Sequence, residues 1–269
     1  MSSWLANLRR LIPKQRARAG TLVRLKSVAS PELGNRRDVV VYLPPSYASG
    51  TRRFRVIYMQ DGQNLFDATT SYAGDWGLAA ALDALATSAE AIVVGVAHAG
   101  EARLEEYSPI SDARGRGGQG EQYLAFLTGR LKPMIDAQFR TRPDPADTGI
   151  AGSSMGGLIS VYAFFREPRA FGFAAILSPS IWFADSAVLS FVRAAPFVPG
   201  RLYVDIGLLE GEGPVSDAGR LRDLLLEKGY RSGVDLRWFE DPDGAHNEAS
   251  WGRRFERALP FLLGGGEGS

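Results

Sequence analysis

The stretch that decides the fold is Thr148–Arg166, which reads TGIAGSSMGGLISVYAFFR. Its first four residues, ending at Ala151, form a short apolar run typical of a buried strand, and Leu158–Arg166 continues as a helix would. Between them, Gly152-Ser153-Ser154-Met155-Gly156 matches the pattern G-x-S-x-G. Glycines two residues on either side of Ser154 let a strand and a helix pass closely at a sharp, strained turn. The stretch therefore predicts a strand, a tight turn that exposes the Ser154 hydroxyl, and a helix.

Outward from this stretch, short apolar runs alternate with longer helical patterns. Further strands are expected at Thr21–Val28, Arg37–Leu43, Phe54–Met59, Ala91–Ala97, Phe173–Leu177, Arg201–Ile206 and Val234–Phe239. Further helices are expected at Asp75–Ser88, Glu121–Phe139, Ser186–Arg193, Ser216–Lys228 and Asn247–Leu263. Apolar strands that alternate with helices imply an α/β fold with a mostly parallel central sheet and helices on both faces. The first two runs alternate apolar and polar residues, as an antiparallel edge pair at the N-terminus would.

The composition excludes several classes of site. The chain has 269 residues, with Lys+Arg 31 against Asp+Glu 30 and a formal net charge of +1, which argues against a nucleic-acid binder. With Cys 0 there can be no disulfide, zinc-thiolate site, iron–sulfur cluster or cysteine nucleophile. No P-loop or G-x-G-x-x-G pattern indicates a phosphate-binding cofactor. We therefore expect no metal and no organic cofactor.

The first twenty residues differ from the rest of the chain. They carry basic side chains without an acidic one, at Arg9, Arg10, Lys14, Arg16 and Arg18. We expect a basic N-terminal arm over residues 1–20 and a single α/β domain over residues 21–269. The apolar residues of the arm are not continuous, as a secretory signal requires, and no run of about 18 apolar residues suits a membrane span. A cytoplasmic protein is expected, and the sequence leaves its oligomeric state open.

A serine nucleophile needs a base, and the sequence offers only His98 and His246. In a fold with such a turn, the chain order is serine, then acid, then histidine. His246 alone follows Ser154, and it comes after the loop Glu240–Ala245 beyond a predicted strand. The order rule therefore selects His246.

The acid that would orient this imidazole is harder to choose. Glu210 comes just after the Arg201–Ile206 strand, where its carboxylate can reach the far nitrogen of His246 and stabilise the imidazolium. Glu212, Asp205 and Asp217 are the main alternatives. Asp205 lies inside the strand, where alternation turns it toward a face of the sheet.

Three further segments carry a resemblance to a known family. They are Tyr58–Asp67 (YMQDGQNLFD), Arg103–Pro109 (RLEEYSP) and Gly244–Trp251 (GAHNEASW). Together with GSSMGG, they resemble the family of α/β-hydrolases called "putative esterase". That family includes enterochelin (siderophore) esterases, feruloyl esterases, S-formylglutathione hydrolases of the esterase D type and mycolyltransferases. The resemblance covers residues 21–263.

The resemblance implies an α/β-hydrolase fold and a Ser154, Glu210 and His246 triad. The backbone N–H of Met155, at the start of the helix, is an expected donor to a substrate oxyanion. The resemblance implies that the backbone N–H of Gln63 is the second donor.

Other residues of these segments are candidates for binding substrate. Asp61 is expected to hold its turn by hydrogen bonds, and Trp76, Arg103 and Tyr107 are candidates to line the pocket, with wall packing and an Arg103–Glu106 ion pair as the alternative. Arg103 would favour an anionic or catecholate ester, and Trp76 would stack on an aromatic acyl group. His98 is expected to have a structural or incidental role.

These residues predict a serine esterase, a carboxylic-ester hydrolase that works through an acyl-enzyme. Its expected partner is a small-molecule ester, of siderophore, feruloyl or other small acyl type, and not a nucleic acid or a membrane. An acyltransferase with the same triad, or a non-catalytic binding protein of the same fold, is the alternative.

Overall fold

An eight-stranded sheet organises the part of the chain described by the computed structural model, residues 19–71 and 74–264. The strands are β1 (Thr21–Ser30), β2 (Asn35–Leu43), β3 (Arg55–Met59), β4 (Ala91–Val96), β5 (Thr148–Ser153), β6 (Phe173–Leu177), β7 (Arg201–Gly207) and β8 (Leu236–Asp241). Their order is β1-β2-β4-β3-β5-β6-β7-β8; β1 pairs antiparallel with β2, β2 antiparallel with β4, and the others pair in parallel. The expected mostly parallel sheet with an antiparallel N-terminal edge is confirmed. The basic arm expected over residues 1–20 lies outside the described residues, apart from its last two.

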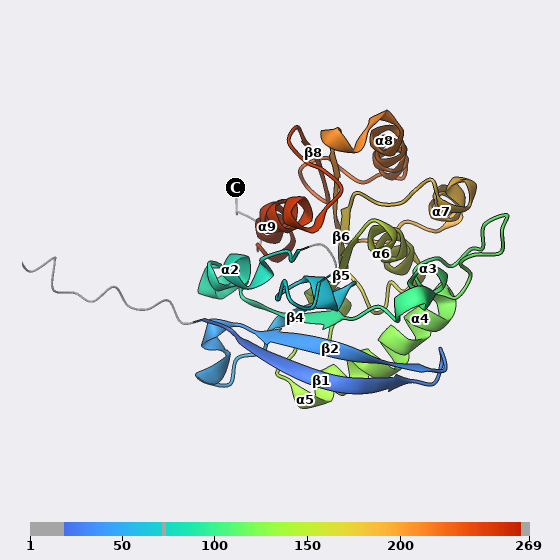
Figure 1. Cartoon of the computed structure of the whole chain (residues 1–269). Coiled ribbons are helices and arrows are strands. Elements are labelled where there is room, and N and C mark those ends of the chain that lie inside the picture. Colours follow the sequence, from blue (N-terminus) through green and yellow to red (C-terminus); the bar gives the residue numbers. More distant parts are fainter. Residues whose placement is uncertain (1–18, 72–73, 265–269) are drawn as a thin grey trace, which may run out of the picture.

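Helices cover both faces of this sheet (Figure 1). The α-helices are α2 (Leu78–Asp83), α3 (Arg103–Glu106), α4 (Gly120–Phe126), α5 (Lys132–Gln138), α6 (Met155–Arg166), α7 (Phe183–Ala194), α8 (Glu212–Glu227) and α9 (Glu248–Leu263). Shorter helical segments are η1 (Pro45–Ala48), η2 (Gly62–Asn64), η3 (Thr87–Ala89), η4 (Gly100–Ala102), η5 (Leu127–Leu131), η6 (Pro145–Asp147) and η7 (Leu208–Glu210). None of the helices in the described ranges is long and apolar enough to cross a bilayer.

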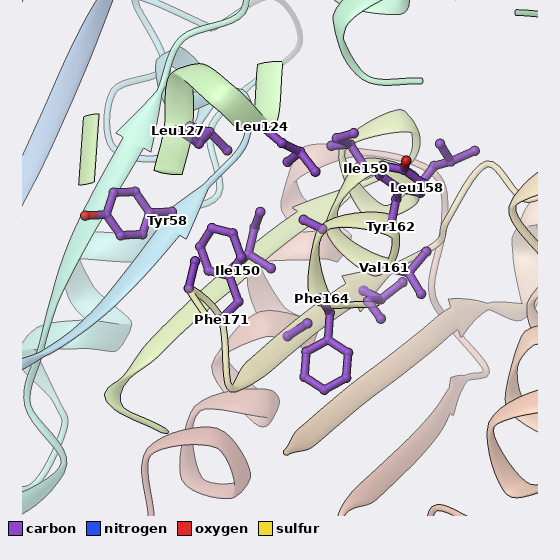
Figure 2. Close-up of a cluster of buried hydrophobic side chains, with 14 of the residues drawn as sticks. Tyr58, Leu124, Leu127, Ile150, Leu158, Ile159, Val161, Tyr162, Phe164 and Phe171 are labelled. Atoms are coloured by element: carbon purple, nitrogen blue, oxygen red, sulfur yellow. The ribbon is translucent and has the colours of Figure 1, made fainter. Parts of the chain in front are cut away.

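Two apolar cores lie on opposite faces, because successive residues of a strand point to opposite sides. Tyr58 and Ile150 contribute to the larger core, with residues of α4 to α8, whereas Ile57 and Ala151 contribute to the smaller one, with α2 and α9. Figure 2 shows part of the larger core, where Leu124 of α4 and residues of α6 surround Ile150. The central strands are therefore buried on both faces, which explains their continuous apolar sequences.

The structure corrects the extent or the composition of several predicted elements. The helix expected at Asp75–Ser88 is limited to α2, because Gly77 before it has the left-handed backbone φ 62° and a second turn, η3, follows separately. The strand expected at Val234–Phe239 begins two residues later, at Leu236. The helix expected at Glu121–Phe139 runs through α4, the π-helical segment η5 and α5.

The connectivity places a crevice at one edge of the sheet. The chain passes from β3 outward to β4 and then crosses back to β5 on the other side of β3. Neighbouring parallel strands whose connections leave in opposite directions open a crevice at their carboxyl ends. The turn after β3 and the turn after β5 both lie there, as do the loops after β7 and β8. The segments that carry the candidate residues therefore meet at this edge.

Close packing of α9 on the β3–α2 connection gives a test of the fold. A Cβ atom on Gly252 of α9 would lie 2.0 Å from the carbonyl oxygen of Trp76, so Gly252→Ala should force the helix away. We expect this substitution to lower the free energy of unfolding by about 1–3 kcal/mol or more in urea titrations. Gly219→Ala on α8 is the matched control, because the nearest atom there, of Arg222, lies 3.8 Å away and alanine favours a helix. Equal stability of the Gly252 variant and the parent would contradict this packing.

Candidate active site

Ser154 occupies a strained turn between β5 and α6. Its backbone angles are φ 58° and ψ −123°, a region that residues other than glycine rarely adopt. A Cβ on Gly152 would lie 2.6 Å from the carbonyl oxygen of Gly156, so the strand and the helix approach too closely there for a larger residue. The Ser154 N–H donates to the carbonyl oxygen of Leu177 on β6 at 3.0 Å, which anchors the turn. The G-x-S-x-G pattern thus forms the sharp turn expected from it.

His246 lies beside this hydroxyl, although the two residues are far apart in sequence. Its Nε2 is 3.0 Å from Ser154 Oγ, and its Nδ1 is 2.6 Å from Glu210 Oε2. Asn247 follows and caps α9, its side chain accepting the N–H of Ser250 at 3.0 Å. The edge-on ring of Trp251, with its centroid 4.8 Å away, packs against the imidazole. The side chain of His246 is 47% exposed and that of Glu210 only 1%, so the imidazole connects a buried carboxylate with solvent.

Glu210 is held on its other oxygen by three donors. Oε1 accepts from Ser178 Oγ at 2.5 Å, from the Gly207 N–H at 3.1 Å and from Arg254 Nη2 at 3.2 Å. Burial raises the pKa of Glu210, but the hydrogen bonds from His246 and Ser178 and the charges of His246 and Arg254 outweigh it and lower that pKa below its ordinary value. The lowered pKa favours the ionised carboxylate of Glu210 beside the imidazole.

The three alternative acids do not face the imidazole. Asp217 pairs with Arg220 at 3.0 Å on the outer part of α8, and Glu212 is exposed in the first turn of that helix. Asp205 is fully buried on β7, where its carboxylate lies 3.6 Å from Arg254. Of the four candidates, the structure brings only Glu210 to the imidazole.

Two backbone N–H groups are placed near the start of helical turns. Met155 is the first residue of α6, and the N–H groups of a first turn have no partner within their own helix. Gln63 lies in η2, where the first bonded donor is the Asn64 N–H, 2.8 Å from the carbonyl oxygen of Asp61. The N–H of Gln63 precedes that donor. Since β3 and β5 are adjacent, η2 and the start of α6 flank the crevice.

Asp61 and Arg103 form a bidentate ion pair next to the η2 turn. Arg103 Nε and Nη2 donate to the two carboxylate oxygens of Asp61 at 2.7 and 2.8 Å. Burial lowers the pKa of Arg103, but the hydrogen bonds and charge of Asp61 outweigh it and raise that pKa above its usual value. The alternative of an Arg103–Glu106 pair is wrong, because Glu106 pairs with Arg37 at 2.7 Å, both side chains being fully buried.

Two other candidates for the pocket are packed inside the protein. Tyr107 is 0% exposed, and its hydroxyl accepts the Asp61 N–H at 3.1 Å, so the expectation that it touches substrate is corrected to a supporting contact under the turn. Trp76 is 6% exposed and packs against Trp251 and Phe255 in the smaller core. The expectation that an acyl group stacks on Trp76 is therefore wrong as well, because Trp251 and Phe255 already cover its ring.

His98 makes local contacts. Its Nδ1 accepts the Gly100 N–H at 2.9 Å, and its own backbone N–H donates to Gln63 Oε1 at 3.3 Å. Burial lowers the pKa of His98. The backbone of His98 therefore holds the Gln63 side chain of η2, while its ring holds the turn that follows at Gly100. Within the described ranges, no group of three or more metal-binding side chains is arranged to hold an ion.

Sequence reasoning missed Ser178 and Arg254. Both are buried, at 2% and 1% exposed, and both donate to Glu210. A signal existed for Arg254, since it lies beside Phe255 and three residues after Trp251 on the apolar side of the last helix. Ser178 gave none, because a serine after a strand is common in turns.

The buried Asp205 gives a test of this electrostatic arrangement. Burial raises the pKa of Asp205 to about 7, although Arg254 and the Ser178 N–H lower it in part. Between about pH 4 and pH 7, the folded protein keeps a proton on Asp205 that the unfolded chain has released. The free energy of unfolding should therefore fall as pH rises through this window, and Asp205 should cause no further change above about pH 7. In urea titrations across that window, the free energy of unfolding of Asp205→Asn should rise relative to that of the parent by about 1 kcal/mol per pH unit. A constant difference between the two proteins would contradict this assignment.

Comparisons with known proteins identify sequences related to this chain. A family model described as "Esterase: Putative esterase" matches residues 30–262. The Bacillus subtilis "Uncharacterized protein YbbA" is 29% identical over 252 residues, which cover 88% of this chain and 96% of that protein. The "Iron(III) salmochelin esterase" of Escherichia coli O6:H1 is 26% identical over 229 residues, 77% of this chain and 52% of that protein, so this chain matches about half of its length.

A solved structure shows the same fold. The crystal structure of the BES protein from Bacillus cereus aligns with a TM-score of 0.72 at 22% identity, covering 90% of this chain and 94% of that one. The family model covers most of this chain, and its range contains Ser154, Glu210 and His246. The chain therefore belongs to the "Putative esterase" family and is a carboxylic-ester hydrolase with an α/β-hydrolase fold.

Proposed function

We propose that the chain hydrolyses carboxylic esters through an acyl-enzyme on Ser154, with His246 as the base and Glu210 as the acid that orients it. One observation carries this proposal. A continuous chain of contacts runs from Glu210 Oε2 to His246 Nδ1 at 2.6 Å and from His246 Nε2 to Ser154 Oγ at 3.0 Å. These are the separations at which a base can take a proton from a hydroxyl.

In the first step, the Ser154 hydroxyl attacks the ester carbonyl carbon. A carboxylate at Nδ1 favours the tautomer that carries its proton there, which leaves the lone pair of Nε2 free to accept the Ser154 proton. The new Oγ–C bond forms as the carbonyl electron pair moves onto oxygen. When this intermediate collapses, the bond to the leaving alcohol breaks and His246 returns the proton to the alcohol oxygen.

The negative charge on the carbonyl oxygen needs donors that are already in place. We assign the backbone N–H groups of Met155 and Gln63 to this role, since both precede the first bonded donor of a helical turn and flank the crevice. Each such donor contributes about 100- to 1,000-fold in rate in comparable enzymes. The Asp61–Arg103 pair holds the Gln63 turn from below.

In the second step, water replaces the alcohol. His246 takes a proton from water as the hydroxide attacks the acyl carbon, and then returns it to Ser154 Oγ as the acid leaves. The exposure of the His246 side chain, 47%, leaves this position open to water. This openness favours hydrolysis over transfer to a second alcohol. The acyltransferase alternative would instead need a bound alcohol to exclude water.

We infer that the substrate is a small-molecule ester whose acyl group is not held by Arg103. The salmochelin esterase among the relatives suggests a siderophore-type ester, and the likeness to a ferulic acid esterase suggests an aromatic acyl group. Arg103 does not favour an anion in the pocket, because its charge is already paired with Asp61, which accepts two hydrogen bonds from the Nε–Nη2 edge of the guanidinium. The charge of Arg103 is therefore used within the protein.

Ser154→Ala tests the proposed nucleophile. The kcat/KM of the variant with p-nitrophenyl butyrate should fall by at least about 1,000-fold, because the triad residues act as a unit. Without the nucleophile, only substrate binding and the oxyanion donors still contribute to the rate. Ser153→Ala, the neighbouring serine of the same motif, is the matched control and should keep most of the activity. Comparable turnover by the Ser154 variant and the parent would instead support a binding protein with an idle triad.

Arg103→Gln tests the inferred substrate class. We expect similar proportional losses of kcat/KM with p-nitrophenyl butyrate and with mono-p-nitrophenyl glutarate, which differ in acyl charge but share a leaving group. The reason is that the substitution disturbs the Asp61 turn and not a contact with the acyl group. A loss confined to the anionic ester would show that Arg103 binds the acyl carboxylate.

A further inference from the structure

A buried arginine and serine lie directly behind the acid of the proposed triad. Arg254 projects from α9 and is 1% exposed, and Ser178 follows β6 and is 2% exposed. Arg254 Nη2 donates to Ser178 Oγ at 2.7 Å and to Glu210 Oε1 at 3.2 Å. Neither side chain can touch a substrate, because both are covered by protein.

The hydrogen bonds of Ser178 determine where its single hydroxyl proton points. Its Oγ accepts from Trp251 Nε1 at 3.1 Å and from Arg254 Nη2 at 2.7 Å, and both of these groups can only donate. A hydroxyl oxygen has two lone pairs, so both are occupied. The proton must therefore be donated to Glu210 Oε1, 2.5 Å away.

The donors to Glu210 leave one of its oxygens for the histidine. Ser178, Arg254 and the Gly207 N–H all meet Oε1 and thereby set the plane of the carboxylate. Oε2 is left to accept from His246. A glutamate needs this restraint, because a long side chain has many rotamers and loses the most entropy on being held.

The charges around Arg254 show why a cation is suited to this place. Its guanidinium faces the Glu210 carboxylate, with Nη2 3.2 Å from Oε1, and arginine is the side chain best suited to a buried ion pair. A charge-assisted hydrogen bond is stronger than a neutral one, so the cation holds Glu210 as an anion more firmly than Ser178 alone could.

We propose that Arg254 and Ser178 act as a positioning pair, which aims the carboxylate of Glu210 at His246 without touching the substrate. This inference deepens the proposed function and rests on it. Trp251 supports the same arrangement. Its indole N–H donates a hydrogen bond to Ser178 Oγ, and its ring packs against the imidazole of His246.

The test uses Arg254→Met, Arg254→Lys and Ser178→Gly in the full chain. Glycine suits position 178, because Ser178 has the left-handed backbone φ 40°, which alanine would find strained. With p-nitrophenyl butyrate, kcat should fall about 10- to 100-fold in Arg254→Met and in Ser178→Gly, as expected for the loss of a hydrogen bond to a charged group, with KM close to that of the parent. Arg254→Lys keeps a cation and should recover part of the loss. Arg257→Gln, an exposed position on the same helix, is the matched control.

A second readout does not depend on turnover. The Nδ1 proton of His246, in its short hydrogen bond to Glu210, should give a low-field resonance in the proton NMR spectrum of the parent, absent from His246→Gln. In Arg254→Met and Ser178→Gly, this resonance should move upfield or broaden while circular dichroism and thermal unfolding show a folded protein.

The outcomes separate this inference from the proposed function. Unchanged kcat and an unchanged resonance in both variants would overturn the positioning role, and so would a rise in KM with kcat preserved. If Arg254→Met did not fold, Ser178→Gly would decide alone by the same criteria. Failure of the proposed function would appear elsewhere, as activity that survives Ser154→Ala, and the resonance would still report on the positioning pair.

Discussion

The rest of the site depends on the positive φ angle of Ser154. A backbone held in such a region costs about 1–3 kcal/mol, so it persists only where the surrounding structure leaves no alternative. Here Gly152 and Gly156 allow β5 and α6 to meet, and the carbonyl oxygen of Leu177 on the neighbouring strand holds the Ser154 N–H. The apolar cores on both faces of the sheet fix β5 and α6 in turn. The strain turns the hydroxyl out of the core and into the crevice, where other segments can reach it.

Those other segments bring a chain of three interacting polar side chains to the hydroxyl, and exposure to solvent increases along it. Arg254 is buried, Glu210 is covered by it and by Ser178, and His246 extends from that carboxylate toward solvent. In a protein interior, such interactions are stronger than in water, but each buried charge must have a partner. These three side chains satisfy this condition, because each contacts the next. The same arrangement explains why the chain combines a firmly held acid with an accessible imidazole.

Much of the fold and of the site follows from local sequence. The strands are recognisable because the central sheet is covered on both faces, and the turn at Ser154 because glycine spacing is a steric requirement. The order of serine, acid and histidine points to His246, since only two histidines exist. Glu210 could be favoured but not separated from Asp205, because the difference depends on which way a side chain leaves a strand end.

Contacts between distant elements could not be read from the sequence. Arg103 was a candidate for the pocket, with Glu106, three residues away, as its alternative partner, but the fold pairs Arg103 with Asp61 and Glu106 with Arg37. Trp76 was expected in the pocket, but α9 covers its ring. In each case the tertiary structure supplied a better partner than the neighbours in sequence.

Covalent labelling tests the central claim most directly, namely that His246 activates the Ser154 hydroxyl. A fluorophosphonate should add one group to the parent, which peptide mapping by mass spectrometry should place on Ser154. The rate of labelling should fall by at least about 100-fold in His246→Ala, since a serine without its base is barely nucleophilic. Modification of a different serine, or equal labelling rates with and without the imidazole, would contradict the account.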